Sequence, residues 1–174
     1  EEQGKWEPAE LEYEEILKKD PNAPGIHFLL GRALLSQPDG GAAAAARAKE
    51  EFLKELQIDP GNADAEYILG LLAQHAEDYD EAVARFSQAA KLNQNFAEAY
   101  LGWGAALIGE KKYQEAIAPL QRAERLTPGN PDIHNALATA LVRTGNKAEA
   151  EKEFAILRSI NSADHSAPAE APPQ

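Results

Sequence analysis

The chain has 174 residues, with 17 lysines and arginines against 29 aspartates and glutamates, which gives a formal charge of −12 with neutral histidines. A hydrophobic fraction of 44% is typical of a folded protein of one domain or two small ones, not of a disordered acidic tail. The absence of cysteine excludes disulfides, thiolate nucleophiles and cysteine-ligated metal centres. The acidic balance argues against nucleic acid and anionic membranes as partners, and no apolar run approaches the ~20 residues of a membrane span.

Amphipathic helices are predicted along the whole chain, because apolar residues recur at spacings of three and four between short breaks. The breaks hold turn residues, as in Asp59-Pro60-Gly61-Asn62 and Thr127-Pro128-Gly129-Asn130. No strand is predicted. The expected helices span residues 8–19, 23–36, 42–57, 63–76, 79–92, 97–109, 113–126, 131–144 and 147–160.

An internal repeat dominates the sequence, and equivalent residues of successive units are 34 positions apart in all but the first unit. The interval from Gly31 to Gly70 is longer by five, so the first unit contains an insertion, Gln37 to Gly41. This insertion is expected to be an elongated surface loop, and the alternative is a protrusion that narrows one end of a binding groove. Three series of residues follow the repeat: Phe52, Phe86, Leu120 and Phe154; Ala48, Ala82, Ala116 and Ala150; and Gly70, Gly104 and Ala138.

The small residues predict close packing of two helices within each unit. Glycine or alanine in the first helix would let the backbones approach, and the large residue of the second helix, Phe154 included, would fill the adjacent space. A glycine inside a helix costs about 1 kcal/mol relative to alanine, so packing must offset this cost. Because a helix pair of this size cannot bury its own apolar face, the units are expected to stack.

The unit resembles the tetratricopeptide repeat. Leu69 and Gly70 stand in the first helix of one unit, and Ala82, Phe86 and Ala89 in its second helix, as the family pattern requires. The first full unit departs from the pattern in its long turn and in having Glu55 in place of the second alanine. The resemblance implies an all-α, right-handed solenoid with a half-repeat at 1–22, repeats at 24–62, 63–96, 97–130 and 131–164, and a disordered Pro/Ala-rich tail at 165–174.

The resemblance further implies a concave groove, lined by the first helix of each pair, that holds a peptide segment of a partner. The apolar members of this groove are either a contact surface or a cover for neighbouring helices. Positions that some relatives use to clamp a C-terminal carboxylate lack the required residues here, Arg32 excepted. The groove residues implied are Phe28, Arg32, Asp64, Tyr67, Leu71, Gln74, Glu98, Leu101, Ala105, Ile108, Asn135 and Thr139.

Asp64, Glu98 and Asp132 keep the interval of the repeat and predict an acidic rim that selects a positively charged ligand. The alternative reading is that each carboxylate occupies the first turn of its helix, where the helix dipole favours negative charge. The two readings are compatible, because a carboxylate that stabilises a helix end can also contact a ligand.

No catalytic, metal or cofactor site is predicted. His27 and His134 occupy equivalent positions three units apart, too distant to share a metal ion, and His75 and His165 lie at a helix end and in the tail. The sequence contains no phosphate-binding glycine-rich loop and no nucleophile elbow. The chain is therefore expected to be a non-catalytic scaffold for a protein or peptide ligand. The alternatives are an oligomerisation module, using the terminal helices, and a regulatory segment of a larger protein.

Overall fold

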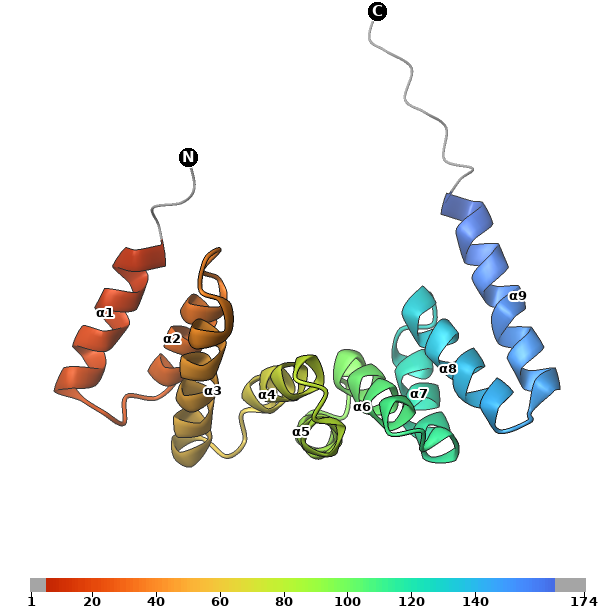
Figure 1. The fold of residues 1–174 in the computed structure, drawn as a ribbon, viewed down its shortest axis with the longest axis horizontal. Helices are drawn as coiled ribbons and strands as arrows, with labels where there is room; N and C mark the ends of the chain where they lie inside the picture. The colour runs from red at the N-terminus through yellow and green to blue at the C-terminus, as the bar shows by residue number, and fades with distance from the viewer. Residues whose placement is uncertain (1–5, 165–174) are drawn as a thin grey trace, which may run out of the picture. The chain divides into compact units, whose positions relative to one another are not determined.

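The computed structural model describes residues 6–164, and within this range every regular element is a helix. The predicted tail at 165–174 lies outside the described residues. The helices form two compact units, Glu1–Gln94 and Asn95–Gln174, which are described separately below. The first unit holds α1 (Trp6–Lys19), α2 (Ile26–Leu35), α3 (Gly41–Ile58), α4 (Ala63–His75) and α5 (Tyr79–Leu92), and the second holds α6 (Ala97–Gly109), α7 (Tyr113–Leu126), α8 (Pro131–Arg143) and α9 (Lys147–Asp164) (Figure 1).

Each predicted helix is confirmed, with bounds that differ by a few residues. α2 begins at Ile26 and not at residue 23, because Gly25 adopts the left-handed conformation with φ of 78°. α9 extends to Asp164, beyond the predicted end at 160. Helix pairs α2–α3 and α4–α5 pack in the first unit, and α6–α7 and α8–α9 pack in the second. The chain is thus an all-α solenoid of helix–turn–helix repeats, as predicted.

The core of the first unit forms where the first helix of one repeat meets the second helix of the same repeat and the first helix of the next. Leu30 and Leu34 of α2, Phe52 of α3 and Leu69 of α4 are buried together, with the small residues Ala48 and Ala65 between them. Ala48 and Phe52 of this core are positions that the repeat analysis assigned to close helix packing. The stacking expected from the size of one helix pair is therefore present within this unit.

A left-handed residue recurs in the turn between the two helices of three repeats. Glu77, Lys111 and Gly145 occupy equivalent positions of successive repeats and have φ values of 58°, 62° and 84°. In all three, the residue that follows donates its N–H back to the helix, as Lys112 N does to Leu107 O at 2.8 Å. This reversal ends the first helix and lets the second fold back against it.

The structure contradicts the expectation that Phe154 fills the interior as its equivalents do. Phe52, Phe86 and Leu120 are fully buried, whereas Phe154 is 38% exposed. Two differences accompany this exposure. No helix follows α9 within the described residues, so a packing partner of the kind that α4 provides for Phe52 is absent there, and Ala138 carries a Cβ where the other repeats have glycine.

Glu55, the departure from the family pattern, has a defined structural role. Its carboxylate is 1% exposed and accepts hydrogen bonds from the backbone N–H groups of Gly25, at 3.0 Å, and Phe28, at 3.2 Å. Gly25 has no side chain with which to cap α2. Glu55 of α3 therefore supplies from a neighbouring helix the negative cap that the start of α2 lacks.

Candidate functional site

The predicted groove residues of the first unit lie on the surface of α2 and α4, and we call this set face 1. Phe28 and Arg32 belong to α2, and Asp64, Tyr67, Leu71 and Gln74 belong to α4. Arg32, Asp64 and Leu71 are exposed, and the other three residues are half-buried. All six are therefore at least partly accessible to a ligand.

The two aromatic residues of face 1 also support the core. The ring of Phe28 meets that of Phe52 edge-on, with centroids 5.7 Å apart, and the ring of Tyr67 lies 5.6 Å from that of Phe86. The Arg32 guanidinium lies 5.9 Å from the centroid of the Phe28 ring, within cation–π range. One side of each ring therefore covers its helix pair, and part of each side chain reaches solvent.

The predicted groove residues of the second unit form face 2. Glu98, Leu101, Ala105 and Ile108 lie on α6, and Asn135 and Thr139 lie on α8, a helix that contacts α6 directly. Glu98 and Asn135 are exposed, and the others are half-buried. The hydroxyl of Thr139 donates to the carbonyl oxygen of Asn135 at 2.9 Å, so its hydrogen is engaged within the helix.

The three carboxylates of the predicted acidic rim all lie in the first turn of their helices and reach solvent. Asp64 belongs to α4, Glu98 to α6 and Asp132 to α8. Asn62 and Asn130 cap two of these helices by accepting hydrogen bonds from Ala65 N and Asp132 N, each at 2.9 Å. The position of the carboxylates fits the helix-dipole explanation, and their exposure leaves them available to a cationic ligand.

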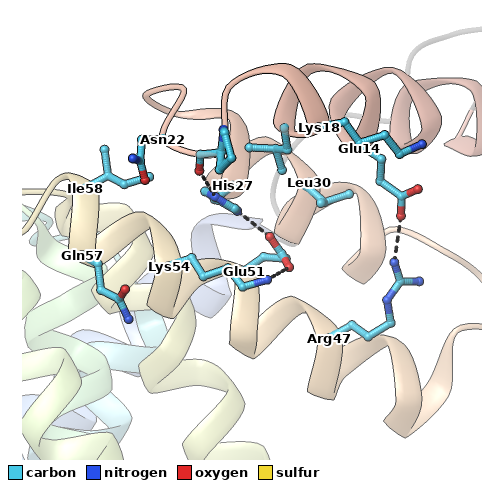
Figure 2. A pocket seen from close by; sticks show the side chains of 12 residues that line it. Glu14, Lys18, Asn22, His27, Leu30, Arg47, Glu51, Lys54, Gln57 and Ile58 are labelled. Atoms are coloured by element: carbon cyan, nitrogen blue, oxygen red, sulfur yellow. Dashed lines mark hydrogen bonds and ion pairs between the residues drawn. The ribbon is translucent and has the colours of Figure 1, made fainter.

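A pocket of about 690 Å³ opens between α1, α2 and α3 (Figure 2). None of the predicted groove residues lines it. Leu17, Leu30 and Ile58 give it apolar walls, while charged side chains from α1 and α3 surround the opening. Arg47 bridges the helices through Glu10 and Glu14, each at 3.1 Å. Sequence reasoning missed this pocket, because its lining residues belong to three helices whose packing no local pattern reports. Its full lining comprises Glu14, Leu17, Lys18, Pro21, Asn22, His27, Leu30, Arg47, Glu51, Lys54, Gln57 and Ile58.

The wall of this pocket contains a hydrogen-bonded chain of ionisable side chains (Figure 2). His27 approaches Glu51 Oε2 with Nδ1 at 2.6 Å and the carbonyl oxygen of Pro21 with Nε2 at 2.9 Å, and Lys54 Nζ lies 2.6 Å from Glu51 Oε1. Burial alone would raise the pKa of Glu51, but the hydrogen bonds from Lys54 and His27 outweigh burial and lower it below its usual value. Glu51 is therefore held as a carboxylate in the wall of the pocket.

The same position carries a polar pair in three of the four repeats, and we call this pair the clasp. In the second repeat the carboxylate is on the first helix instead of the second: Glu66 of the first helix accepts from Arg85 of the second at 3.1 Å. In the fourth repeat the clasp is again a histidine and a glutamate, His134 and Glu153. In the third repeat the equivalent residues are Tyr100 and Pro119. The recurrence of histidine with glutamate in the first and last units is the sequence signal that could have revealed the clasp.

His134 has two hydrogen-bond acceptors facing its ring. Nδ1 lies 2.7 Å from Glu153 Oε2, and Nε2 lies 2.8 Å from the carbonyl oxygen of Pro128. Both ring nitrogens can donate only in the imidazolium form. Burial alone would lower the pKa of His134, but these two hydrogen bonds, with the charges of Glu153 and Glu124, raise it above its usual value.

Known proteins resemble this chain in sequence. Two family models, both described as tetratricopeptide repeat, match it, one over residues 1–63 and 67–131 and the other over residues 107–169. The small glutamine-rich tetratricopeptide repeat-containing protein 2 of Mycosarcoma maydis is 27% identical over 114 residues, or 63% of this chain. The chain spans 30% of the length of that curated relative.

Solved structures resemble the chain in fold. A crystal structure of MamA superposes with a TM-score of 0.83 at 24% identity and covers 94% of this chain and 93% of its own. MamA 41-end from Desulfovibrio magneticus RS-1 gives a TM-score of 0.79 at 23% identity, over 94% of this chain and 89% of its own. Tetratricopeptide repeat proteins are generally non-catalytic scaffolds with protein partners, and none of the described helices is both long and apolar enough to cross a membrane. Because the family models match well over half of its residues, the chain belongs to the tetratricopeptide repeat family, and its repeats form a protein-interaction scaffold.

Proposed function

We propose that this scaffold binds a peptide segment of a partner protein on the surface of its first helices, through face 1 and face 2. The observation that carries the proposal is Leu71, a large apolar side chain that is 41% exposed in the middle of α4. Tyr67 lies one turn before it on the same helix and is half-buried. Water contact with such a strip is unfavourable, so a ligand with apolar side chains gains by covering it.

The aromatic residues of face 1 are suited to act as anchors. Phe28 and Tyr67 are held by their contacts with Phe52 and Phe86, so binding would cost little additional side-chain entropy. Arg32, which lies beside the Phe28 ring, adds one positive group to a surface that is otherwise apolar and acidic. The preferred ligand therefore presents apolar residues to α2 and α4.

The acidic rim favours a positively charged ligand. Asp64 lies one turn before the apolar strip of face 1, and Glu98 and Asp132 occupy the equivalent positions on α6 and α8. Exposed carboxylates at such positions would favour lysine or arginine beside the apolar anchors and would repel acidic peptides. We propose on the same ground, together with the net charge of −12, that the chain does not bind nucleic acid. We also propose that it acts without catalysis, as tetratricopeptide repeat proteins generally do.

The proposal is tested with a phage-displayed library of random peptides selected on the purified chain. The expected result is enrichment of peptides that combine leucine or aromatic residues with lysine or arginine. Leu71→Glu should weaken the binding of the selected peptides at least about tenfold, because it places a charge in the apolar strip. Leu92→Glu is the matched control, since Leu92 is 38% exposed but lies on the second helix α5.

Circular dichroism of each variant establishes that the helices are retained. The proposal fails if the selected peptides bind Leu71→Glu and Leu101→Glu as tightly as they bind the unmodified chain. It also fails if the acidic class of peptides is enriched instead, because the rim would then have no part in recognition.

A second candidate function is self-association through a terminal helix. Leu11 on α1 is 63% exposed, the largest exposure recorded for a large apolar side chain within the described residues. If α1 packs against a second copy, light scattering over a dilution series will show a dimer that Leu11→Glu abolishes. A monomer at every concentration removes this candidate and leaves the peptide proposal intact.

A further inference from the structure

Two carboxylates and an imidazole converge in the second unit, outside face 2. Glu124 of α7, His134 of α8 and Glu153 of α9 each present one ligand atom, and these atoms lie within 4.8 Å of one another. His134 is 1% exposed, Glu153 is buried and Glu124 is half-buried. We propose that these three side chains bind a divalent transition-metal ion of the zinc class.

The donor set suits such an ion. Zn²⁺ takes imidazole nitrogen and carboxylate oxygen as ligands at about 2.0–2.2 Å, and two carboxylates balance its charge. The atoms of the cluster are already close enough that small rotations of the two glutamate side chains bring them around one ion. Three protein ligands leave a further coordination position for water or for a group of the partner.

The orientation of His134 is that of a metal ligand with its outer hydrogen bond in place. Nε2 donates to the carbonyl oxygen of Pro128, which fixes the ring and directs Nδ1 toward Glu153. A backbone carbonyl on the far nitrogen is a common partner of histidines that ligate metals. The ion would take the place of the hydrogen that Nδ1 shares with Glu153, so binding releases a proton.

The first repeat provides an internal comparison, because it contains the same clasp without the third carboxylate. The residue ten positions before His134 is Glu124, whereas the residue ten positions before His27 is Leu17. The equivalent positions in the remaining repeats are Leu56 and Ala90. Glu124 thus places a carboxylate where the other three repeats have an apolar residue. The clasp does not require this carboxylate, because His27 and Glu51 form the same pair in the first repeat without one.

The charges around the two clasps also differ. Glu51 is neutralised by Lys54 at 2.6 Å, whereas the residue equivalent to Lys54 beside Glu153 is Ile156. Within the part of the chain that the structure describes, neither Glu124 nor Glu153 forms an ion pair with a lysine or arginine. The His134 cluster therefore combines two carboxylates with no lysine or arginine, whereas Glu51 of the His27 clasp is paired with Lys54.

The experiment uses the full chain without an affinity tag, treated with a chelator and dialysed. Isothermal titration calorimetry with Zn²⁺ should show one ion bound per chain, and Co²⁺ should give the visible absorption of a nitrogen and oxygen site. Ca²⁺ should bind at least about tenfold more weakly, because it prefers more oxygen ligands in a larger shell. These probes report binding without any activity measurement.

Two variants remove ligands while copying chemistry that the chain already tolerates. Glu124→Leu reproduces Leu17 of the first repeat, and the double change His134→Glu with Glu153→Arg reproduces the clasp of Glu66 and Arg85. Each should lower Zn²⁺ affinity at least about tenfold and keep the helical circular dichroism. Glu151→Leu, an exposed position on α9, is the control and should bind as the unmodified chain does.

The proposal is overturned if the unmodified chain binds no Zn²⁺, or if a folded Glu124→Leu variant binds it with unchanged affinity. Equal loss of affinity in Glu151→Leu would likewise overturn it, because binding would then arise from surface carboxylates. Retained binding in Glu151→Leu with loss in the two ligand variants supports the site at Glu124, His134 and Glu153.

Discussion

The ring of Phe86 occupies the space that a side chain at residue 70 would need. A Cβ built on Gly70 would lie 2.7 Å from Cδ1 and Cε1 of Phe86, closer than carbon atoms approach without displacement. The same relationship joins Gly31 to Phe52, at 2.9 Å, and Gly104 to the side chain of Leu120. The glycine of each of these first helices is thus required because a neighbouring second helix fills its place.

Gly70→Ala should destabilise the chain although alanine is the better helix former. The gain in helix propensity is about 1 kcal/mol, while displacing the Phe86 ring in a packed core costs about 1–3 kcal/mol, so we expect a net loss of up to about 2 kcal/mol. Urea unfolding measures this difference. Gly129→Ala is the control, because a Cβ added there would meet no neighbouring atom within 4 Å and the stability should be nearly unchanged.

Lys111→Gly, unlike Gly70→Ala, should stabilise the chain. Lys111 has φ of 62°, a conformation that costs an L-residue about 1 kcal/mol and that glycine adopts freely. Gly145 already occupies the equivalent turn, so the substitution copies the fourth repeat. We expect a gain of about 0.5–1 kcal/mol in the free energy of unfolding, measured by urea denaturation, and a loss would show that the lysine side chain contributes more than the turn strain removes.

Glu55→Ala restores the residue that the family pattern expects and should nevertheless destabilise the first unit. The change removes the acceptor for two backbone N–H groups, those of Gly25 and Phe28. Leaving such donors without a partner costs about 1–3 kcal/mol. In this variant the backbone amides at the start of α2 should exchange their hydrogens faster than in the unmodified chain. Unchanged exchange there would contradict the capping role.

The clasp should be transferable between repeats. Arg85→Glu places a second carboxylate against buried Glu66 and should cost about 3 kcal/mol or more. Adding Glu66→His recreates the pair that His27 makes with Glu51 and should recover most of that loss. A double-mutant cycle measured by denaturant unfolding gives the coupling energy, and additive effects of the two changes would mean that the pair does not interact.

The ion pair between Lys49 and Glu81 makes the stability of the chain depend on pH. The hydrogen bond from Lys49 of α3, at 2.7 Å, lowers the pKa of Glu81 of α5 below its usual value of 4.5, and burial opposes this only in part. Because the folded pKa is the lower one, the stabilisation is present above pH 4.5 and is lost as the pH falls through the folded pKa. Glu81→Gln should therefore have a lower Tm than the unmodified chain at about pH 7, with a difference that disappears in acid.

The control for this measurement is Glu12→Gln, which removes one negative charge from an exposed position on α1. Its Tm should follow that of the unmodified chain at every pH. A Tm difference for Glu81→Gln that persists in strong acid would contradict an electrostatic origin, because both forms are neutral there.

The sequence by itself determined the number, order and approximate ends of the helices, because apolar periodicity and turn residues act over a few positions along the chain. It also determined the role of Gly70, since close approach of two helices leaves a signature at a fixed interval. The twelve groove residues that it predicted lie on accessible surface, and their part in binding remains a prediction.

Only the tertiary structure decided how the charged residues inside the repeats are used. In the sequence Glu55 is only a departure from the family pattern, whereas in the structure its carboxylate caps the start of α2. Glu124 has no signal in the sequence, and only the packing of α7, α8 and α9 brings it to His134 and Glu153. Phe154 follows the repeat and still remains exposed. These outcomes depend on contacts between helices that are distant in sequence, and such contacts are set by packing geometry, which no local pattern contains.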